Sequence, residues 1–308
     1  MKHGQKKLKV CQVCAVDFTL DKFLKPLVKG MEARGWNVVS VCSNGPKVES
    51  IKAEGFVVKN IEIARSFNPV RAIVSTYQLY KFFREMHFDV VHVHTPVASV
   101  VGRFAAFFAK VPLIVYTAHG FYFHENMSRP AFYFHVGIEK ILGCITTVLL
   151  TQSLEDHKDA IRFGFKASNN CHVIGNGVDH FKFNPRTCSS RNYMRDALGI
   201  KPNDFVVGFV GRRVEEKGVN ELMQALTQVF HVRPNLCCLM IGGRLQSDHS
   251  ANVESSITAA KKVLGQNFID LGFREDTHEL YCAMDLFCLP SWREGLPRTI
   301  IEAMMSAK

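Results

Sequence analysis

Two glutamates stand eight positions apart in the stretch SWREGLPRTIIEAMM, Glu294 before a Gly-Leu-Pro turn and Glu302 after it. On one regular helix this spacing would leave the two side chains ~80° and ~12 Å apart. A turn at Gly295 shortens that separation, and Pro297 suits the first position of a helix that carries Glu302 in its second turn. Because a carboxylate accepts hydrogen bonds from neighbouring hydroxyls, the pair is suited to a ribose and a pyranose. The alternative is that Glu302 is merely a polar residue on an amphipathic helix.

A basic loop precedes the helix that is predicted from residue 219. In GFVGRRVEEKGVNELMQAL, Arg212 follows a strand and a glycine, and Lys217 and Gly218 open the helix. Two cations beside a helix amino terminus, with glycines that allow close backbone approach, suit a diphosphate. A solvated Arg-Lys pair is the alternative. The loop is not a Walker loop, because GxxxxGK[ST] is absent.

Histidines end two predicted strands. His119 stands beside Gly120 in VYTAHGFYFH, where an imidazole can donate a hydrogen bond or shuttle a proton, or simply be a satisfied polar residue. His92 and His94 share one strand face without a local carboxylate or thiol, so we expect packing at His92 and at most a lining role for His94 rather than a metal site. There is also no Asp-x-Asp with which to hold a divalent ion.

Apolar runs rich in Val, Ile and Phe alternate with segments of helical period. The predicted strands are 9–16, 37–42, 56–63, 88–94, 112–117, 146–151, 171–175, 205–210, 236–242, 268–272 and 285–290. The predicted helices include 26–34, 70–86, 101–109, 153–164, 219–230 and 276–284. Strands that are apolar on both faces, each followed by a helix, predict a doubly wound α/β fold with parallel sheets.

A polar, turn-rich segment at 180–193 interrupts the alternation and places a domain boundary between residues 1–187 and 188–308. Ligands of such sheets bind at the carboxyl ends of the strands, so the loops would meet in one interdomain cleft if the two sheets face each other. The first turn, AVDFTLDKFLKP, has no glycine, which argues against a nicotinamide dinucleotide site.

Positive charge is concentrated in the first half. Residues 1–187 carry 24 Lys and Arg against 14 Asp and Glu, an excess of 24 − 14 = 10, whereas 188–308 carry 14 of each. A one-sided basic field attracts a lipid surface, a diphosphate or a nucleic acid, although it can also serve only solubility. No nucleic-acid recognition motif accompanies it, so we expect no nucleic-acid partner.

The composition predicts a protein without a membrane span or a disulfide framework. The most apolar stretches are broken by charged residues and proline, or are shorter than the ~20 residues that a span needs. The start reads as a first strand rather than a signal peptide. Ten cysteines without repeated spacing indicate a reducing compartment, the cytoplasm, and we expect Cys11 and Cys14 to be buried thiols rather than a zinc or redox pair.

Six stretches follow one another along nearly the whole chain: FDVVHVHTPVAS, YTAHGFYF, QSLEDHKDA, VIGNGVDHFKFNP, VGRRVEEKG and LGFREDTHELYCAMDLFCLPSWREGLPRTIIEAM. Together they resemble a family 4 glycosyltransferase of the capsule and exopolysaccharide type. The resemblance implies the GT-B fold, with an acceptor-side and a donor-side Rossmann-like domain facing across a cleft. It also implies a hexosyltransferase-type enzyme that moves a sugar, with retention, from a nucleotide diphosphate donor, expected to be UDP-linked, without a cofactor or a metal.

The resemblance assigns roles to the residues described above. It implies that Arg212 and Lys217 bind the donor diphosphate, that Glu294 contacts the sugar and Glu302 the ribose, and that His119 lies near the reacting carbon. Stabilising the departing diphosphate is then the main electrostatic task.

Three further residues belong to the same expected donor site. The amides around Gly295 and Leu296 would cradle sugar and phosphate, and Arg274 would lie close to the base. With no obvious enzyme nucleophile, we expect departure and attack on the same face of the sugar.

This branch of the family commonly builds on a polyprenyl diphosphate carrier at the inner membrane leaflet, so the resemblance implies a lipid-linked or other saccharide acceptor and an anionic membrane surface as partners. The segment VRAIVSTYQLYKFFREMHF suits such a peripheral contact. It mixes cations with aromatic residues, namely Arg71, Lys81, Arg84, Tyr77, Tyr80, Phe82 and Phe83. Core packing accounts for most of those aromatics equally well.

Two departures from the family pattern affect these expectations. VDFTLDKF replaces a glycine-rich first loop, so little weight falls on Asp17. Family members continue beyond EAMMSAK, so we expect an incomplete second domain in which the apolar side chains of the last helix (Ile300, Ile301, Met304 and Met305) are exposed. Two alternatives stay open: a nucleotide-sugar epimerase of the same fold, and an inactive fragment that retains only nucleotide-sugar binding.

Overall fold

The computed structural model describes residues 7–64, 68–124, 127–186, 191–244, 251–292 and 294–308. The chain divides into two compact units, Met1–Gly175 and Asn176–Lys308. The boundary predicted between residues 187 and 188 lies outside the described residues and stays a prediction.

The first unit contains a parallel sheet with the strand order β3-β2-β1-β4-β5-β6-β7. Its strands are β1 (Lys9–Val13), β2 (Asn37–Cys42), β3 (Val58–Asn60), β4 (Val90–His94), β5 (Leu113–Ala118), β6 (Val148–Thr151) and β7 (Cys171–Val173). The order reverses between β1 and β4. This switch point is where doubly wound sheets bind ligands.

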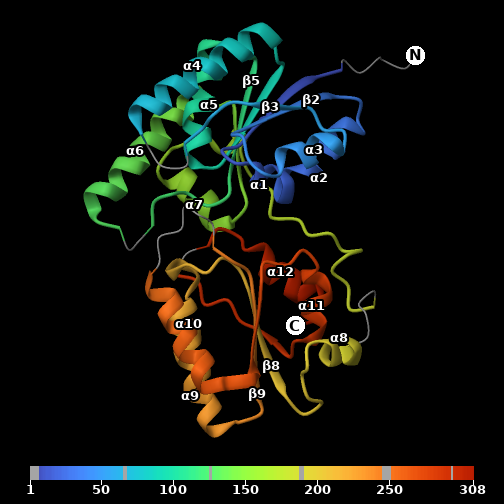
Figure 1. Cartoon of the computed structure of the whole chain (residues 1–308). Coiled ribbons are helices and arrows are strands. Elements are labelled where there is room, and N and C mark those ends of the chain that lie inside the picture. The colour runs from blue at the N-terminus through green and yellow to red at the C-terminus, as the bar shows by residue number, and fades with distance from the viewer. Residues whose placement is uncertain (1–6, 65–67, 125–126, 187–190, 245–250, 293) are drawn as a thin grey trace. The chain divides into compact units, whose positions relative to one another are not determined.

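Helices cover both faces of this sheet (Figure 1). They are α1 (Asp17–Thr19), a π-helix (Leu20–Leu24), α2 (Lys25–Glu32), α3 (Val48–Ala53), α4 (Pro69–Met86), α5 (Pro96–Phe108), α6 (Arg129–Ile145) and α7 (Leu154–Arg162). The segment VDFTLDKF is therefore helical, since α1 and the π-helix follow β1 almost directly.

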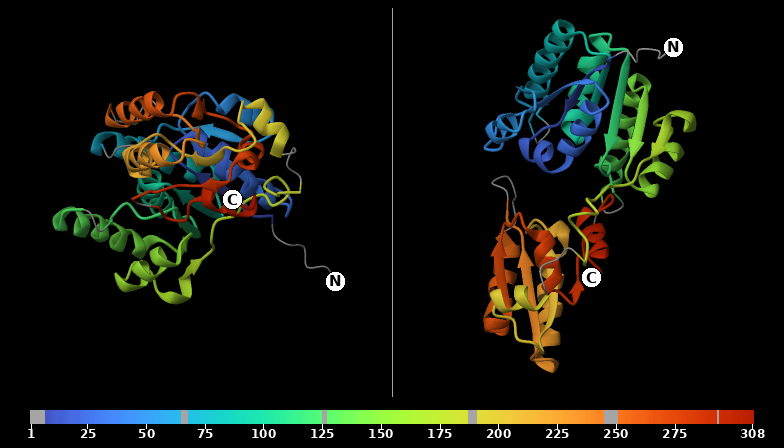
Figure 2. Two further views of the ribbon diagram at one scale, coloured as in Figure 1. Left: turned by 90° about the horizontal axis from the view of Figure 1, so that it is seen from below. Right: turned by 90° about the vertical axis from the view of Figure 1, so that its right-hand side faces the viewer.

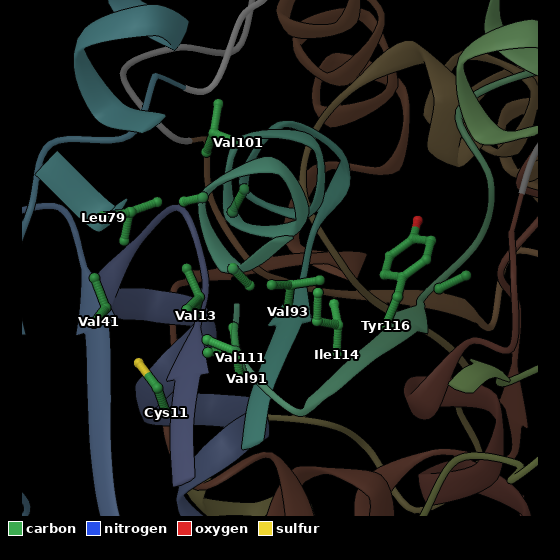
Figure 3. Close-up of a cluster of buried hydrophobic side chains, with 14 of the residues drawn as sticks. Cys11, Val13, Val41, Leu79, Val91, Val93, Val101, Val111, Ile114 and Tyr116 are labelled. Atoms are coloured by element: carbon green, nitrogen blue, oxygen red, sulfur yellow. The ribbon is translucent and has the colours of Figure 1, made fainter. Parts of the chain in front are cut away.

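Alternate residues of β1 point into different cores. Cys11 and Val13 pack with Leu79 of α4 and Val101 of α5 (Figure 3). Cys14 lies on the opposite face, in the cluster that includes α2 and α3. Both thiols are free and buried, and burial raises both pKa values. The prediction of buried thiols is confirmed.

The second unit contains a smaller parallel sheet with the order β10-β9-β8-β11, which reverses between β8 and β11. The strands are β8 (Phe205–Val210), β9 (Leu236–Ile241), β10 (Phe268–Gly272) and β11 (Leu286–Phe287). The helices are α8 (Arg191–Ala197), α9 (Val219–Val232), α10 (Ala251–Leu264), α11 (Thr277–Ala283) and α12 (Arg298–Met305). Helices α9 and α10 lie on one face of the sheet, and α8 and α11 on the other (Figures 1 and 2).

Each predicted strand is present among the described residues, and the doubly wound α/β prediction is confirmed for both units. The prediction for Pro297 was wrong by one position: it caps α12 in an extended conformation instead of opening the helix. The apolar side chains of Ile300, Met304 and Met305 are exposed as expected, whereas Ile301 is half-buried. Within the described residues, no helix has both the length and the apolar character needed to cross a bilayer.

Candidate functional site

Two of the predicted site residues meet at the switch point of the second sheet. Lys217 lies in the short turn that follows β8, and Glu294 lies in the loop that follows β11. The Lys217 ammonium forms an ion pair with Oε1 of Glu294, and Ser291 Oγ donates a hydrogen bond to the same oxygen over 2.7 Å. The side chains are 20% and 22% exposed, so the pair can be reached from solvent. Sequence reasoning had given Ser291 no role.

The two loops are fixed against each other by backbone contacts. Gly218 has φ +66°, and a Cβ added there would lie 1.9 Å from the carbonyl oxygen of Pro290. Trp292 donates its backbone N–H to the Glu216 carbonyl and its indole N–H to Glu221 Oε1, over 3.0 and 3.1 Å. The close contact at Gly218 therefore sets the distance between the strand ends that carry Lys217 and Glu294.

The carboxyl ends of β8, β9 and β10 also converge through glycines. Gly242 has φ +123°, and a Cβ there would lie 1.9 Å from the Gly211 carbonyl oxygen. The Gly242 N–H donates to the Gly272 carbonyl over 2.7 Å. The start of the basic loop is thus supported by direct backbone contact with its neighbours.

The second arginine of the basic loop, Arg213, has a structural role that the sequence did not indicate. Arg213 turns towards β9 and β10, where its Nε donates to the Gly242 carbonyl over 2.8 Å and its Nη1 contacts Asp270 Oδ2 over 3.1 Å. Lys261 also contacts Asp270, over 2.6 Å. Burial raises the pKa of Asp270, but hydrogen bonds from Arg213 and Lys261 outweigh it and leave that pKa below its ordinary value. Arg213 therefore stabilises the loop, while the half-buried Arg212 keeps its predicted donor-binding role as a prediction.

Glu302 lies in the second turn of α12, as predicted, and its side chain is only 12% exposed. The Tyr281 hydroxyl lies 3.2 Å from its Oε2, and Arg298 lies 3.9 Å from its Oε1. Burial raises the pKa of Glu302 above its ordinary value, and Arg298 and the bond from Tyr281 only partly oppose this. The predicted contact of Glu302 with a ribose stays a prediction, and Tyr281 is a partner that the sequence did not indicate.

The remaining donor-side predictions concern three residues around these loops. Gly295 and Leu296 are half-buried between Glu294 and α12, and the Leu296 carbonyl accepts a hydrogen bond from Asn176 Nδ2 over 2.9 Å. Arg274 pairs with Asp276 in its own loop through a 2.8 Å bond from Nε to Oδ1. Its role near a base stays a prediction.

In the first unit, His119 joins a chain of hydrogen bonds across the switch point between β1 and β4. Its Nε2 lies 3.1 Å from Nδ1 of His94, and His94 Nε2 lies 2.8 Å from Oε1 of Gln12. Beside this chain, His92 Nε2 lies 2.7 Å from the Thr117 hydroxyl. The chain thus links three neighbouring strands at their carboxyl ends.

Burial keeps the three imidazoles neutral at pH 7. It lowers the pKa of His92 to about 3 and that of His94 well below its usual value. It also lowers the pKa of His119, against an opposing hydrogen bond with Gln152. Packing at His92 is confirmed, since it is 6% exposed. His94 is 1% exposed and contacts His119, which is within the expectation of at most a lining role.

Of the aromatic residues predicted for the surface of α4, Tyr77 is exposed and the other three pack against the core, as the alternative stated. Phe83 is buried and Phe82 and Tyr80 pack partly against the core, because they lie on the side that faces the sheet. The exposed apolar residues instead follow the spacing i, i+3, i+4, i+7 and are Val70, Ile73, Val74 and Tyr77, at 71%, 70%, 50% and 59% exposure. We name these four residues the α4 stripe.

The described part of the chain contains no group of three or more His, Cys, Asp or Glu side chains placed to hold a metal ion. The expectation of metal-free chemistry stays a prediction.

The two wound units have the architecture of GT-B glycosyltransferases. HepE from Anabaena, solved in complex with UDP-glucose, superposes with a TM-score of 0.77 at 22% identity, covering 98% of this chain and 79% of that one. A likeness at this identity establishes the fold, and the GT-B prediction is confirmed.

Family models identify the chain more closely. The model "Glycosyl transferase 4-like" matches residues 9–153, and "Glycosyl transferases group 1" matches residues 190–308. The chain belongs to the family 4 glycosyltransferases, as its motifs predicted.

Two curated relatives illustrate the branch of the family. An Escherichia coli UDP-Gal:alpha-D-GlcNAc-diphosphoundecaprenol alpha-1,3-galactosyltransferase is 30% identical over 244 residues, which cover 78% of this chain and 62% of that protein. The putative glycosyltransferase EpsD of Bacillus subtilis is 29% identical over 303 residues, covering 97% of this chain and 76% of that protein. The chain thus spans less than two thirds of the length of the first of these relatives.

Proposed function

We propose that the protein transfers a sugar, with retention, from a nucleotide diphosphate donor to a lipid-linked saccharide in the synthesis of a surface polysaccharide. The observation that carries the proposal is the Lys217–Glu294 ion pair at the switch point between β8 and β11. It combines a cation for a diphosphate with a carboxylate for sugar hydroxyls at the place where doubly wound sheets bind ligands.

The geometry suggests how these groups act. A donor diphosphate would take over the Lys217 ammonium, beside Arg212 and the amino terminus of α9, and the positive charge would stabilise the leaving group as its bond to the sugar breaks. Glu294, released from Lys217 but still held by Ser291, would then accept hydrogen bonds from the sugar. Glu302 would accept those of the ribose.

The relatives support the classes of donor and acceptor. The name of the Escherichia coli relative contains UDP-Gal as donor and a diphosphoundecaprenol-linked acceptor. The name of a further relative, from Campylobacter jejuni, also contains a diphospho-undecaprenol-linked acceptor. We therefore propose a UDP-linked donor and a polyprenyl-diphosphate-linked acceptor for this chain, with the basic first unit nearest to the anionic carrier.

The α4 stripe suits docking to an anionic bilayer. Four exposed apolar side chains can enter the headgroup region, while the neighbouring Lys81, whose Nζ lies 5.5 Å from the centre of the Tyr77 ring, and the exposed Arg84 face lipid phosphates. We propose that this surface holds the enzyme at the inner face of the cell membrane as a peripheral protein.

The donor site is tested with Lys217→Met and Glu294→Gln in the full chain. We expect each to lower kcat/KM roughly 100-fold or more, because each removes a group used at the reacting diphosphate or sugar. Calorimetry with UDP-sugars should show a loss of affinity for Lys217→Met of about 10-fold, the scale of one charge-assisted contact. Lys262→Met is the control, because it removes the same charge from an exposed position on α10.

The outcomes separate the proposal from its alternatives. Full activity of both variants would refute the site. Conversion of the donor in the absence of an acceptor would indicate an epimerase. Heat of binding with a nucleotide diphosphate sugar, but transfer to no acceptor, would indicate an inactive fragment that retains only nucleotide-sugar binding.

Membrane docking is tested by flotation with vesicles that contain anionic lipid. Ile73→Glu should weaken binding about 10-fold or more. The substitution removes an apolar side chain whose burial in the bilayer contributes roughly 1.5–3 kcal/mol. It also adds a negative charge that the anionic lipids repel. Val232→Glu, at a residue of the second unit that is 79% exposed, should leave binding unchanged. Equal losses in the two variants would refute docking through the α4 stripe.

A further inference from the structure

The chain of hydrogen bonds that ends at His119 has a defined direction. The Gln12 amide nitrogen lies 3.2 Å from the sulfur of Met31, and this contact turns Oε1 of Gln12 towards His94. An amide oxygen only accepts hydrogen bonds, so the proton of His94 must lie on Nε2, which is the atom that contacts Gln12.

The same reasoning extends one residue further. In a neutral imidazole the second nitrogen carries no proton, so Nδ1 of His94 is an acceptor. The atom that contacts it over 3.1 Å is Nε2 of His119. This nitrogen must therefore be the protonated one, which leaves Nδ1 of His119 as a lone-pair acceptor.

We propose that Gln12 and His94 are positioning residues that fix His119 as the Nε2–H tautomer, so that His119 meets a substrate hydroxyl with Nδ1 as a hydrogen-bond acceptor. The inference rests on the proposed function, because a transferase of this family is what the resemblance uses to place His119 near the reacting carbon. It changes what His119 does there: the residue does not donate a hydrogen bond to the substrate, and it orients a hydroxyl instead.

Burial supports this arrangement. Gln12 is fully buried and His94 is 1% exposed, so water does not compete for their hydrogen bonds. The neighbouring rings of His92 and His94 are neutral at pH 7, because burial lowers the pKa of both. Gln152 also has a hydrogen bond with His119 that raises the His119 pKa, so the tautomer of His119 depends on the contact with His94 together with this uncharged amide.

The direct test is a long-range ¹H–¹⁵N correlation spectrum of the full chain with ¹⁵N-labelled histidine rings, which shows the nitrogen that carries each proton. We expect Nε2–H at both His94 and His119. A proton on Nδ1 of His119 in the unmutated chain would overturn the inference, and this measurement needs neither a variant nor a substrate.

Variants test the role of the chain. Gln12→Leu removes the terminal acceptor, so we expect mixed tautomers at His94 and His119 and a fall in kcat of roughly 10-fold, the scale seen when a partner that orients a histidine is lost. Thr117→Val is the matched control, because it removes a buried hydrogen bond from His92 on the same sheet face but none from the chain. Unchanged tautomers in Gln12→Leu, or the same change in Thr117→Val, would overturn the inference.

Transfer assays separate the two proposals. If the unmutated chain shows Nε2–H at His119 but transfers no sugar to any lipid-linked acceptor, the proposed function fails and the tautomer assignment stands. If the chain transfers sugar but His119 carries its proton on Nδ1, the tautomer assignment fails and the proposed function stands.

Discussion

The two switch points of the molecule differ in the charge and the exposure of their side chains. At β8 and β11 a lysine and a glutamate face each other, each about one fifth exposed. At β1 and β4 an amide and imidazoles form a buried, neutral chain. Charge is tolerated where water still reaches it, and buried groups are kept neutral because burial of an ion is costly. Under the proposed function, the second unit would handle the anionic leaving group and the first unit would orient uncharged hydroxyls.

The largest expected effect concerns the backbone contact that builds the charged switch point. Gly218→Ala places a methyl group against the Pro290 carbonyl at a positive φ, so we expect a loss of roughly 2–4 kcal/mol in the stability of the second unit. Gly199→Ala is the control, because Gly199 has φ +69° and no atom within 4 Å of the position that a Cβ would take, and should cost about 1 kcal/mol. Urea unfolding measures both. Equal losses would mean that conformational strain, and not the contact with β11's loop, makes Gly218 necessary.

The neutral switch point predicts sensitivity to acid. The pKa of His92 is about 3 in the folded chain, so below pH 6.5 the unfolded chain binds more protons than the folded one, and stability falls as pH falls towards 3. The slope should reach about 1.4 kcal/mol per pH unit for each such histidine, and His94 and His119 add to it. His92→Gln should flatten the slope of the unfolding free energy between pH 6.5 and 5, whereas His172→Gln, at an exposed position of β7, should not. An equal slope in all three proteins would contradict the buried neutral network.

The smallest expected effect concerns Glu302, a partly buried carboxylate of α12 that contacts Tyr281. Its raised pKa means that donor affinity should fall on acidification at a higher pH than for an ordinary glutamate. Tyr281→Phe removes a hydrogen bond that lowers the pKa of Glu302, so the loss of donor affinity on acidification should begin at a higher pH. In that acidic range we expect a loss of about 1 kcal/mol in binding free energy, and at pH 8 little change. Calorimetry with the donor at several pH values measures this. A profile that matches that of the exposed control Tyr133→Phe would argue against a role for Glu302.

Much of this architecture could be predicted from the sequence, because strands buried on both faces are continuous apolar runs and their carboxyl ends mark the loops that carry function. The meeting of Lys217 and Glu294 followed from that rule. The role of Arg213 did not, because it depends on the Asp270 side chain, which reaches the loop only through the pairing of β8, β9 and β10.

Two other features were hidden for similar reasons. Gln12 sits in an apolar strand with no local sign of a partner, and its function depends on a histidine 82 positions later. On α4, Phe82 and Val70 are equally apolar in the sequence, and only packing against the sheet decides that the first is covered and the second exposed.

The pairing of Lys217 with Glu294 has a consequence for how binding responds to ionic strength. A diphosphate that reaches a lysine already paired with a carboxylate must break that ion pair, which offsets part of its attraction to the lysine. Added salt screens the resting pair and the bound pair alike. Donor affinity should therefore vary only weakly with the concentration of sodium chloride. A pocket whose lysine has no counter-ion before the donor binds should show a stronger dependence.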